Sequence, residues 1–204
     1  MPEGARIYRN LLVMGLAVLL SACGFQLRGT GTNQLTITEL GLSARDAYGQ
    51  TVRDLRLALE GSGVKITDAA PYKLVLNNEQ ENQRAASYTG TGSTAEYELT
   101  KVLNYQIKGD NNLVLLENKV EARKFFMQDT GNIAGSTQEA SMVRKELDRD
   151  LVQQVLLRLE QLTPARLAEL QTLADEKARA EAAALEAQQK AEAETPQQSP
   201  LELP

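Results

Sequence analysis

Acidic side chains recur at a spacing that could support acid-base chemistry. Glu96 and Glu98, like Glu79 and Glu81, are separated by one residue, which on a β-strand places both carboxylates on one face. Glycoside hydrolysis uses such pairs, but alternating acids are also the ordinary polar face of a half-exposed strand. The chain has no histidine, which excludes Ser-His-Asp triads, Cys-His pairs and the commonest zinc sites. We therefore interpret these acids as surface residues, and we expect no catalytic residue, metal site or cofactor.

The only cysteine, Cys23, ends the sequence Leu20-Ser21-Ala22-Cys23. A basic flank and the apolar run 11–20 precede it, as in an export signal, and the run is too short for a membrane span of about 20 residues. The ending resembles a bacterial lipobox. That resemblance implies cleavage after Ala22, S-diacylglycerol on the Cys23 thiol and an N-palmitoyl group. The following Gly24, which is not Asp, implies transfer to the outer membrane. The alternative is an ordinary signal peptide with an incidental cysteine.

Lys101 is a charged residue on the apolar face of the clearest strand pattern, where it falls between two leucines. A β-bulge or a snorkelling lysine stem would explain this position. The functional interpretation is a cation beside an apolar groove, suited to an anionic amphiphile. Arg123 and Lys124 on the next predicted strand, and Arg84 before the preceding loop, could add positive charge.

The periodicity of apolar residues predicts the element order β-α-β-β-β-α. We expect a strand over 35–40, a helix over 46–60 with Asp46 at its start and a left-handed Gly61 at its end, and a short extended piece over 64–67. A strand from 72 to about 83 and a long hairpin over 95–126, turning at 109–112, follow. A capping box of Ser136 and Glu139 opens the next helix. These elements predict an α+β fold in which two amphipathic helices cover one face of a four-stranded, mixed and mostly antiparallel sheet. A helix connects the first two strands, so they can be parallel.

The composition divides the chain into five segments. We expect a signal peptide over 1–22, a lipidated linker over 23–33 and a globular domain over 34–164. A charged, Ala/Glu-rich helix over 165–194 and a disordered tail over 195–204 complete the chain. The net charge is −5, and no segment is strongly basic, which argues against a nucleic-acid partner.

Four stretches together resemble the LptE family of lipopolysaccharide-assembly lipoproteins, over roughly residues 23–164. They are Cys23-Gly24-Phe25-Gln26-Leu27-Arg28, Thr94-Ala95-Glu96-Tyr97, Arg123-Lys124-Phe125-Phe126 and Val143-Arg144-Lys145-Glu146-Leu147.

The resemblance implies a non-enzymatic protein on the periplasmic face of the outer membrane. Such a protein plugs an LptD-type β-barrel one to one, supports its assembly and binds lipopolysaccharide. Arg84, Lys101, Arg123 and Lys124 are then the candidate lipopolysaccharide contacts. The alternative is a lipoprotein scaffold of another envelope machine, for barrel insertion or the cell wall, with helix 165–194 as its adaptor.

Overall fold

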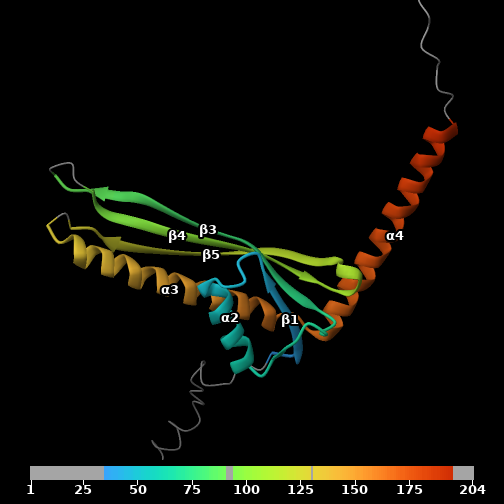
Figure 1. Cartoon of the computed structure of the whole chain (residues 1–204), viewed down its shortest axis with the longest axis horizontal. Helices are drawn as coiled ribbons and strands as arrows, with labels where there is room; N and C mark the ends of the chain where they lie inside the picture. Colours follow the sequence, from blue (N-terminus) through green and yellow to red (C-terminus); the bar gives the residue numbers. More distant parts are fainter. Residues whose placement is uncertain (1–34, 91–93, 130, 195–204) are drawn as a thin grey trace, which may run out of the picture. The chain divides into compact units, whose positions relative to one another are not determined.

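The computed structural model describes residues 35–90, 94–129 and 131–194 (Figure 1). Cys23 and the predicted signal peptide, linker and C-terminal tail lie outside the described residues. The strands are β1 (Glu39–Ala44), β2 (Lys65–Ile66), β3 (Lys73–Tyr88), β4 (Thr94–Lys108) and β5 (Val114–Met127). The helices are α2 (Gln50–Gly61), α3 (Ile133–Glu160) and α4 (Pro164–Glu194), with the short 3-10 turn η1 (Asp110–Asn112).

The strands form one mixed sheet in the order β2-β1-β3-β4-β5. The parallel arrangement of β1 and β3 and the antiparallel β3-β4-β5 meander confirm the predicted class. The sheet has five strands rather than the predicted four, because the extended piece at Lys65–Ile66 pairs with Glu39 and Leu40. The first strand also lies four residues later than predicted. Leu35 and Ile37 are buried, but the backbone pairs with β3 only from Gly41 onward.

The β4-β5 hairpin follows its predicted turn. Asn111 and Asn112 both take positive φ angles, of 56° and 60°, a backbone region that asparagine tolerates better than most residues. Leu99, Leu103, Tyr105 and Ile107 alternate along β4 and are almost completely buried. The predicted apolar face of this strand is therefore the face that meets the core.

α2 and α3 cover one face of the sheet (Figure 1). Leu55 and Leu59 of α2 and Leu147, Leu151 and Val155 of α3 are fully buried against it. The opposite face, which we call the open face, carries the alternate residues of β3, β4 and β5. Along β4 the row that faces the helices is mostly apolar and the row on the open face is mostly polar. β3 departs from this pattern beyond Leu76, because Glu79 and Glu81 face the helix side.

Three predicted helix caps are wrong. α2 begins at Gln50 after Gly49, with no side-chain cap, and Asp46 instead accepts a hydrogen bond from the Tyr48 amide. Gly63, with φ 84°, takes the left-handed position that was predicted for Gly61.

The predicted capping box at the start of α3 does not form either. This helix begins at Ile133, where Asn132 caps it by accepting from the Gly135 amide. Ser136 lies inside the helix, and Glu139 accepts from the Met127 amide of β5.

α4 starts on the core and then leaves it. Leu167 is buried, and the Gln171 side chain accepts a hydrogen bond from the Asp110 amide at the hairpin turn. Later residues such as Leu173 and Leu185 are more than half exposed. Of the helices in the described ranges, none is both long and apolar enough to cross a membrane.

Candidate functional site

An arginine cluster lies on the open face near the end of β3 and the start of β4, where β3, β4 and β5 run side by side. Arg84 on β3 lies directly across from Glu98 on β4, and Phe125 on β5 lies across from Glu98 on its other side. Arg84 donates two hydrogen bonds to the Glu98 carboxylate, at 3.1 and 2.7 Å. Arg123 contacts the same carboxylate at 3.3 Å. We call Arg84, Glu98 and Arg123 the arginine cluster.

The arginine cluster combines a buried anion with exposed cations. The Glu98 side chain is only 5% exposed, whereas those of Arg84 and Arg123 are 62% and 50% exposed. The hydrogen bonds from Arg84 hold the pKa of Glu98 below its usual value, so the carboxylate is ionised at neutral pH. Phe125 is 51% exposed beside it. The arrangement therefore places two guanidinium groups next to an exposed aromatic ring, a combination that can contact both an anionic group and an apolar chain.

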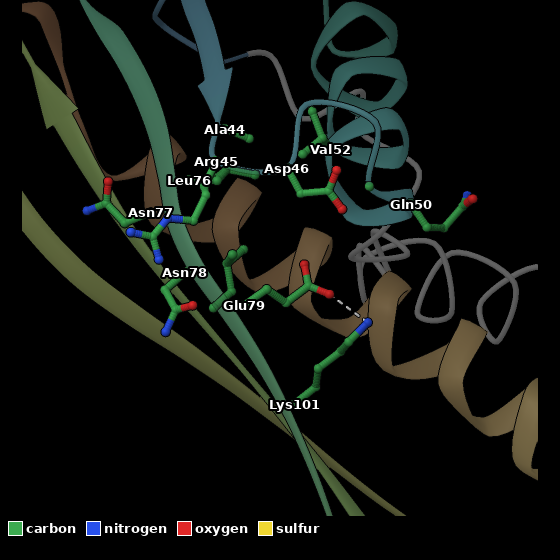
Figure 2. Close-up of a pocket in the computed structure, with 12 residues that line it drawn as sticks. Ala44, Arg45, Asp46, Gln50, Val52, Leu76, Asn77, Asn78, Glu79 and Lys101 are labelled. Carbon is green, nitrogen blue, oxygen red and sulfur yellow. Dashed lines mark ion pairs between the residues drawn. The ribbon is translucent and has the colours of Figure 1, made fainter.

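Lys101 lies on the other face of the sheet, toward α3. β4 pairs regularly with β5 at this point, so no β-bulge displaces Lys101 from the apolar face. Its amine contacts Asp148 of α3 and lies 2.7 Å from Glu79 of β3 (Figure 2). Burial alone would lower the pKa of Lys101, but the bonds to Asp148 and Glu79 outweigh burial and raise it. Lys101 is thus a buried, doubly paired cation rather than a free one.

A cavity of about 290 Å³ adjoins this lysine, between the β1-α2 connection and β3. A register shift between Leu76 and Asn78 of β3 lies at its wall. The lining mixes apolar residues such as Val52 and Leu76 with charged ones such as Arg45 and Asp46 (Figure 2). This mixed lining differs from the apolar groove that the sequence suggested beside Lys101.

The structure divides the four predicted cations into two groups. Arg84 and Arg123 meet in the arginine cluster. Lys101 and Lys124 lie on the helix side, where Lys124 pairs with Asp150 at 3.0 Å and with Glu146 at 3.8 Å. The sequence prediction missed the acidic partners. Asp148 was detectable, because it falls on the apolar stripe of its helix just as Lys101 falls on the apolar face of its strand.

Three of the four carboxylates in the predicted pairs form ion pairs. Glu98 belongs to the arginine cluster, Glu79 contacts Lys101, and Glu81 contacts Arg144 at 2.7 Å. In residues 35–90, 94–129 and 131–194, no group of three or more acidic, His or Cys side chains could hold a metal ion. These three ion pairs tie β3 and β4 to neighbouring elements, so they have a structural role.

Known proteins share both the sequence and the fold. Residues 37–159 match the model of the LptE family, described as lipopolysaccharide-assembly. An LPS-assembly lipoprotein LptE from Pectobacterium atrosepticum is 34% identical over 154 residues, covering 72% of this chain and 83% of that protein. The LPS-assembly lipoprotein LptE of Yersinia enterocolitica is 32% identical over 156 residues, covering 73% of this chain and 74% of that protein.

Solved structures agree with this assignment. The rare lipoprotein B of Shewanella oneidensis superposes with a TM-score of 0.51 at 26% identity, covering 70% of this chain and 98% of that one. A minor lipoprotein of Acinetobacter baumannii has a TM-score of 0.53 at 17% identity, covering 60% and 90%, which supports the fold alone. The family match over residues 37–159 covers all five strands of the sheet, α2 and nearly all of α3. The chain belongs to the LptE family.

Proposed function

We propose that this protein is a non-enzymatic lipoprotein of lipopolysaccharide assembly. In this role it is held on the periplasmic face of the outer membrane by acyl chains on Cys23. It plugs one LptD-type β-barrel, supports the assembly of that barrel, and binds lipopolysaccharide during delivery to the cell surface. The observation that carries the proposal is the LptE family match over residues 37–159, together with relatives that are named LPS-assembly lipoproteins.

The arginine cluster supports lipopolysaccharide binding. Lipopolysaccharide carries phosphates and acyl chains, and two exposed arginines beside Phe125 offer partners for both. Arg123 also pairs with Glu121 at 3.2 Å. Each guanidinium has five N–H donors, so those that do not bond to Glu98 or Glu121 are available to a phosphate. Of the four candidates, Arg84 and Arg123 are the best placed. Lys124 is 35% exposed, and Lys101, at 11%, is the least accessible.

The test compares matched arginine pairs. Replacing Arg84 and Arg123 by Ala, with Glu98→Gln so that no buried charge is stranded, should raise the Kd for purified lipopolysaccharide at least tenfold over Glu98→Gln alone. Arg56→Ala with Arg179→Ala, which also removes two exposed arginines, should change the Kd less than twofold.

Equal effects of the two arginine pairs would mean that lipopolysaccharide responds only to total charge. A separate experiment tests the plug proposal. Gentle detergent extraction of outer membranes that contain the unaltered, tagged protein should co-purify an LptD-type barrel. Failure to recover one would overturn the plug proposal.

A further inference from the structure

β3 becomes an edge of the sheet beyond its pairing with β1. β1 bonds to β3 only over residues 73–76, whereas β3 continues to Tyr88. Every residue from 79 to 84 is exposed, and β3 runs along the side of the hairpin that lies away from α3 (Figure 1). We call residues 79–85 the β3 edge.

The outward backbone groups of the β3 edge are unused. The carbonyls of Tyr72 and Leu76 accept hydrogen bonds from β1, and the register shift after Leu76 reverses the alternation. Beyond this shift the even-numbered residues of β3 face β4. Four residues therefore point their amide and carbonyl groups away from the sheet: Glu79, Glu81, Gln83 and Ala85. Within the described part of the chain, no hydrogen bond reaches those groups.

The edge of the sheet at β5 is protected, whereas the β3 edge is not. Gln154 of α3 donates a hydrogen bond to the Glu121 carbonyl at 2.8 Å, and the Met127 amide donates to Glu139 at 3.2 Å. Covering contacts of this kind, and unpaired charges, keep other strands from adding to an edge. Among the described residues, the β3 edge has neither. Its three charged side chains already pair within the domain: Glu79, Glu81 and Arg84.

The cavity of about 290 Å³ lies where the β3 edge begins. Ala44 at the end of β1 lines it, as do Leu76, Asn78 and Glu79 of β3 (Figure 2). A strand added along the β3 edge would follow the line of β1, so its last residues would reach this cavity. The edge thus offers unpaired backbone groups along a strand and a side-chain pocket at one end.

We infer that the occupant of the β3 edge is the same edge of a second copy of this chain, paired antiparallel about a two-fold axis at Asn82. In this register Glu79 lies opposite Ala85 of the second copy and Glu81 lies opposite Gln83. Each such pair exchanges two backbone hydrogen bonds, and no like charges are opposed. Sliding the strands by two residues in one direction would set Glu81 opposite itself, which is unfavourable. Sliding them in the other direction would leave Glu79 unpaired within the edge.

The same register supplies a side chain for the cavity. Tyr88 is 65% exposed and lies three residues beyond Ala85. The two-fold axis brings it past Glu79 of the second copy, to the stretch beside Leu76 where the cavity opens. Each copy therefore offers an aromatic ring to the cavity of the other, and buried aromatic rings contribute strongly to interfaces. The inference goes beyond the proposed function, because it concerns the protein free of its barrel. The two copies must separate before one of them plugs one barrel.

A symmetric disulfide tests the pairing. Cys23 is the only cysteine of the chain and the predicted lipid site, so a second, introduced cysteine can be followed by itself. Asn82 would oppose itself in a non-hydrogen-bonded pair, with Cα atoms about 4.5 Å apart, a separation that a disulfide can span. Asn82→Cys in the full-length lipidated protein, purified without a barrel and oxidised, should form at least fivefold more covalent dimer than Gln80→Cys.

Gln80→Cys is the matched control. Position 80 is exposed on the same strand and the same face, but it would lie opposite Arg84 of the second copy. The two introduced thiols would then be about 13 Å apart along the strand, at roughly 3.3 Å per residue, which is too far for a disulfide. Equal amounts of dimer from positions 80 and 82, or no dimer from either, would overturn the inference.

Proline substitution tests the backbone bonds. Gln83→Pro removes an outward N–H and leaves the β3-β4 hydrogen bonds in place. In the Asn82→Cys background it should lower the yield of covalent dimer at least fivefold, whereas Gln83→Ala, which keeps the N–H, should change it less than twofold. Circular dichroism confirms that each variant is folded. An undiminished dimer in a folded Gln83→Pro variant would overturn the inference.

The cavity contact provides a measurement that needs no proline. Tyr88→Ala in the otherwise unaltered protein should raise the dissociation constant of the dimer at least fivefold in sedimentation experiments. The control is Phe125→Ala on β5, another half-exposed aromatic residue, which should leave the dissociation constant unchanged. Equal effects of the two substitutions would contradict the proposed register.

Barrel recovery is a separate measurement, so the two failures can be told apart. A protein that recovers its barrel but forms no dimer through position 82 keeps the plug proposal and overturns this inference. The reverse result supports the dimer and removes the plug. A disulfide from position 82 to another envelope protein, with none between two copies of this chain, would identify a different occupant and would also overturn the inference.

Discussion

At the scale of single residues, the most informative position is Lys101. A charged side chain on the apolar face of a central strand is costly unless partners surround it. The chain supplies two, Asp148 from α3 and Glu79 from β3. These contacts join three elements at one point. Lys101 thus has a structural role. The sequence pattern placed it on the apolar face but did not reveal its acidic partners.

Removing the Lys101 cation should destabilise the protein. Lys101→Met leaves Asp148, whose side chain is 8% exposed, without its partner, and we expect a loss of about 3 kcal/mol in the free energy of unfolding. Urea denaturation of the soluble domain measures it. The double variant Lys101→Met with Asp148→Leu removes the stranded charge and should recover most of the loss. A double variant as unstable as the single one would contradict this account and point to packing of the lysine stem.

At the scale of elements, the sequence predicts what repeats and misses what is local. The β4-β5 hairpin was predictable because alternation continues over more than ten residues on each side of an Asn-rich turn. The helix caps were not, because Asp46, Asn132 and Ser136 can each bond to several nearby amides. Tertiary contacts decided between them, as when Glu139 bonded to the edge of β5 instead of capping its own helix.

The candidate site divides in the same way. Alternation along β4 and β5 places Glu98 and Arg123 on the polar face, but the sequence grouped Arg84, Arg123 and Lys124 with Lys101, which lies on the opposite face of the sheet. The pairing of Arg84 with Glu98 was not predicted, because the register between β3 and β4 depends on the shift at Leu76 and on the loop that connects the two strands. A one-residue change in register would put Arg84 on the other face.

α4 combines an anchored start with an exposed remainder, and substitutions should separate the two. Leu167→Ala, at a position 1% exposed, should cost about 3 kcal/mol of unfolding free energy. Leu173→Ala, on the same helix but 53% exposed, should change it by less than about 0.5 kcal/mol. Equal costs would mean that α4 still packs against the domain at Leu173. Thermal or urea unfolding of the two variants measures this difference.

Truncation after Ala178 extends the comparison to function. It removes only residues beyond the anchored part of α4, so the folded domain and barrel recovery should both be retained. Loss of the barrel in this variant, with the domain still folded, would favour the alternative in which the helix is an adaptor for another envelope machine.

At the scale of the whole molecule, the two faces of the sheet have different tasks. The helix face contributes the core and the Lys101 ion pairs. The open face carries the arginine cluster, which is the proposed contact for lipopolysaccharide. This proposal requires the domain to stay close to the outer membrane.

Acylation of Cys23 is the predicted means of staying there. Two or more acyl chains hold a protein stably on a bilayer, at about 0.8 kcal/mol per buried CH₂, and confinement raises its effective concentration near a membrane-embedded partner. Cys23→Ala should abolish incorporation of labelled fatty acid, leave the protein soluble or uncleaved, and reduce barrel recovery. Gly24→Asp is the matched control: it should keep the acyl label but leave the protein in the inner membrane. Labelled fatty acid in the Cys23→Ala variant would show that the lipid is attached elsewhere. Full barrel recovery without the label would mean that contacts with the barrel, and not the lipid, hold the protein in place.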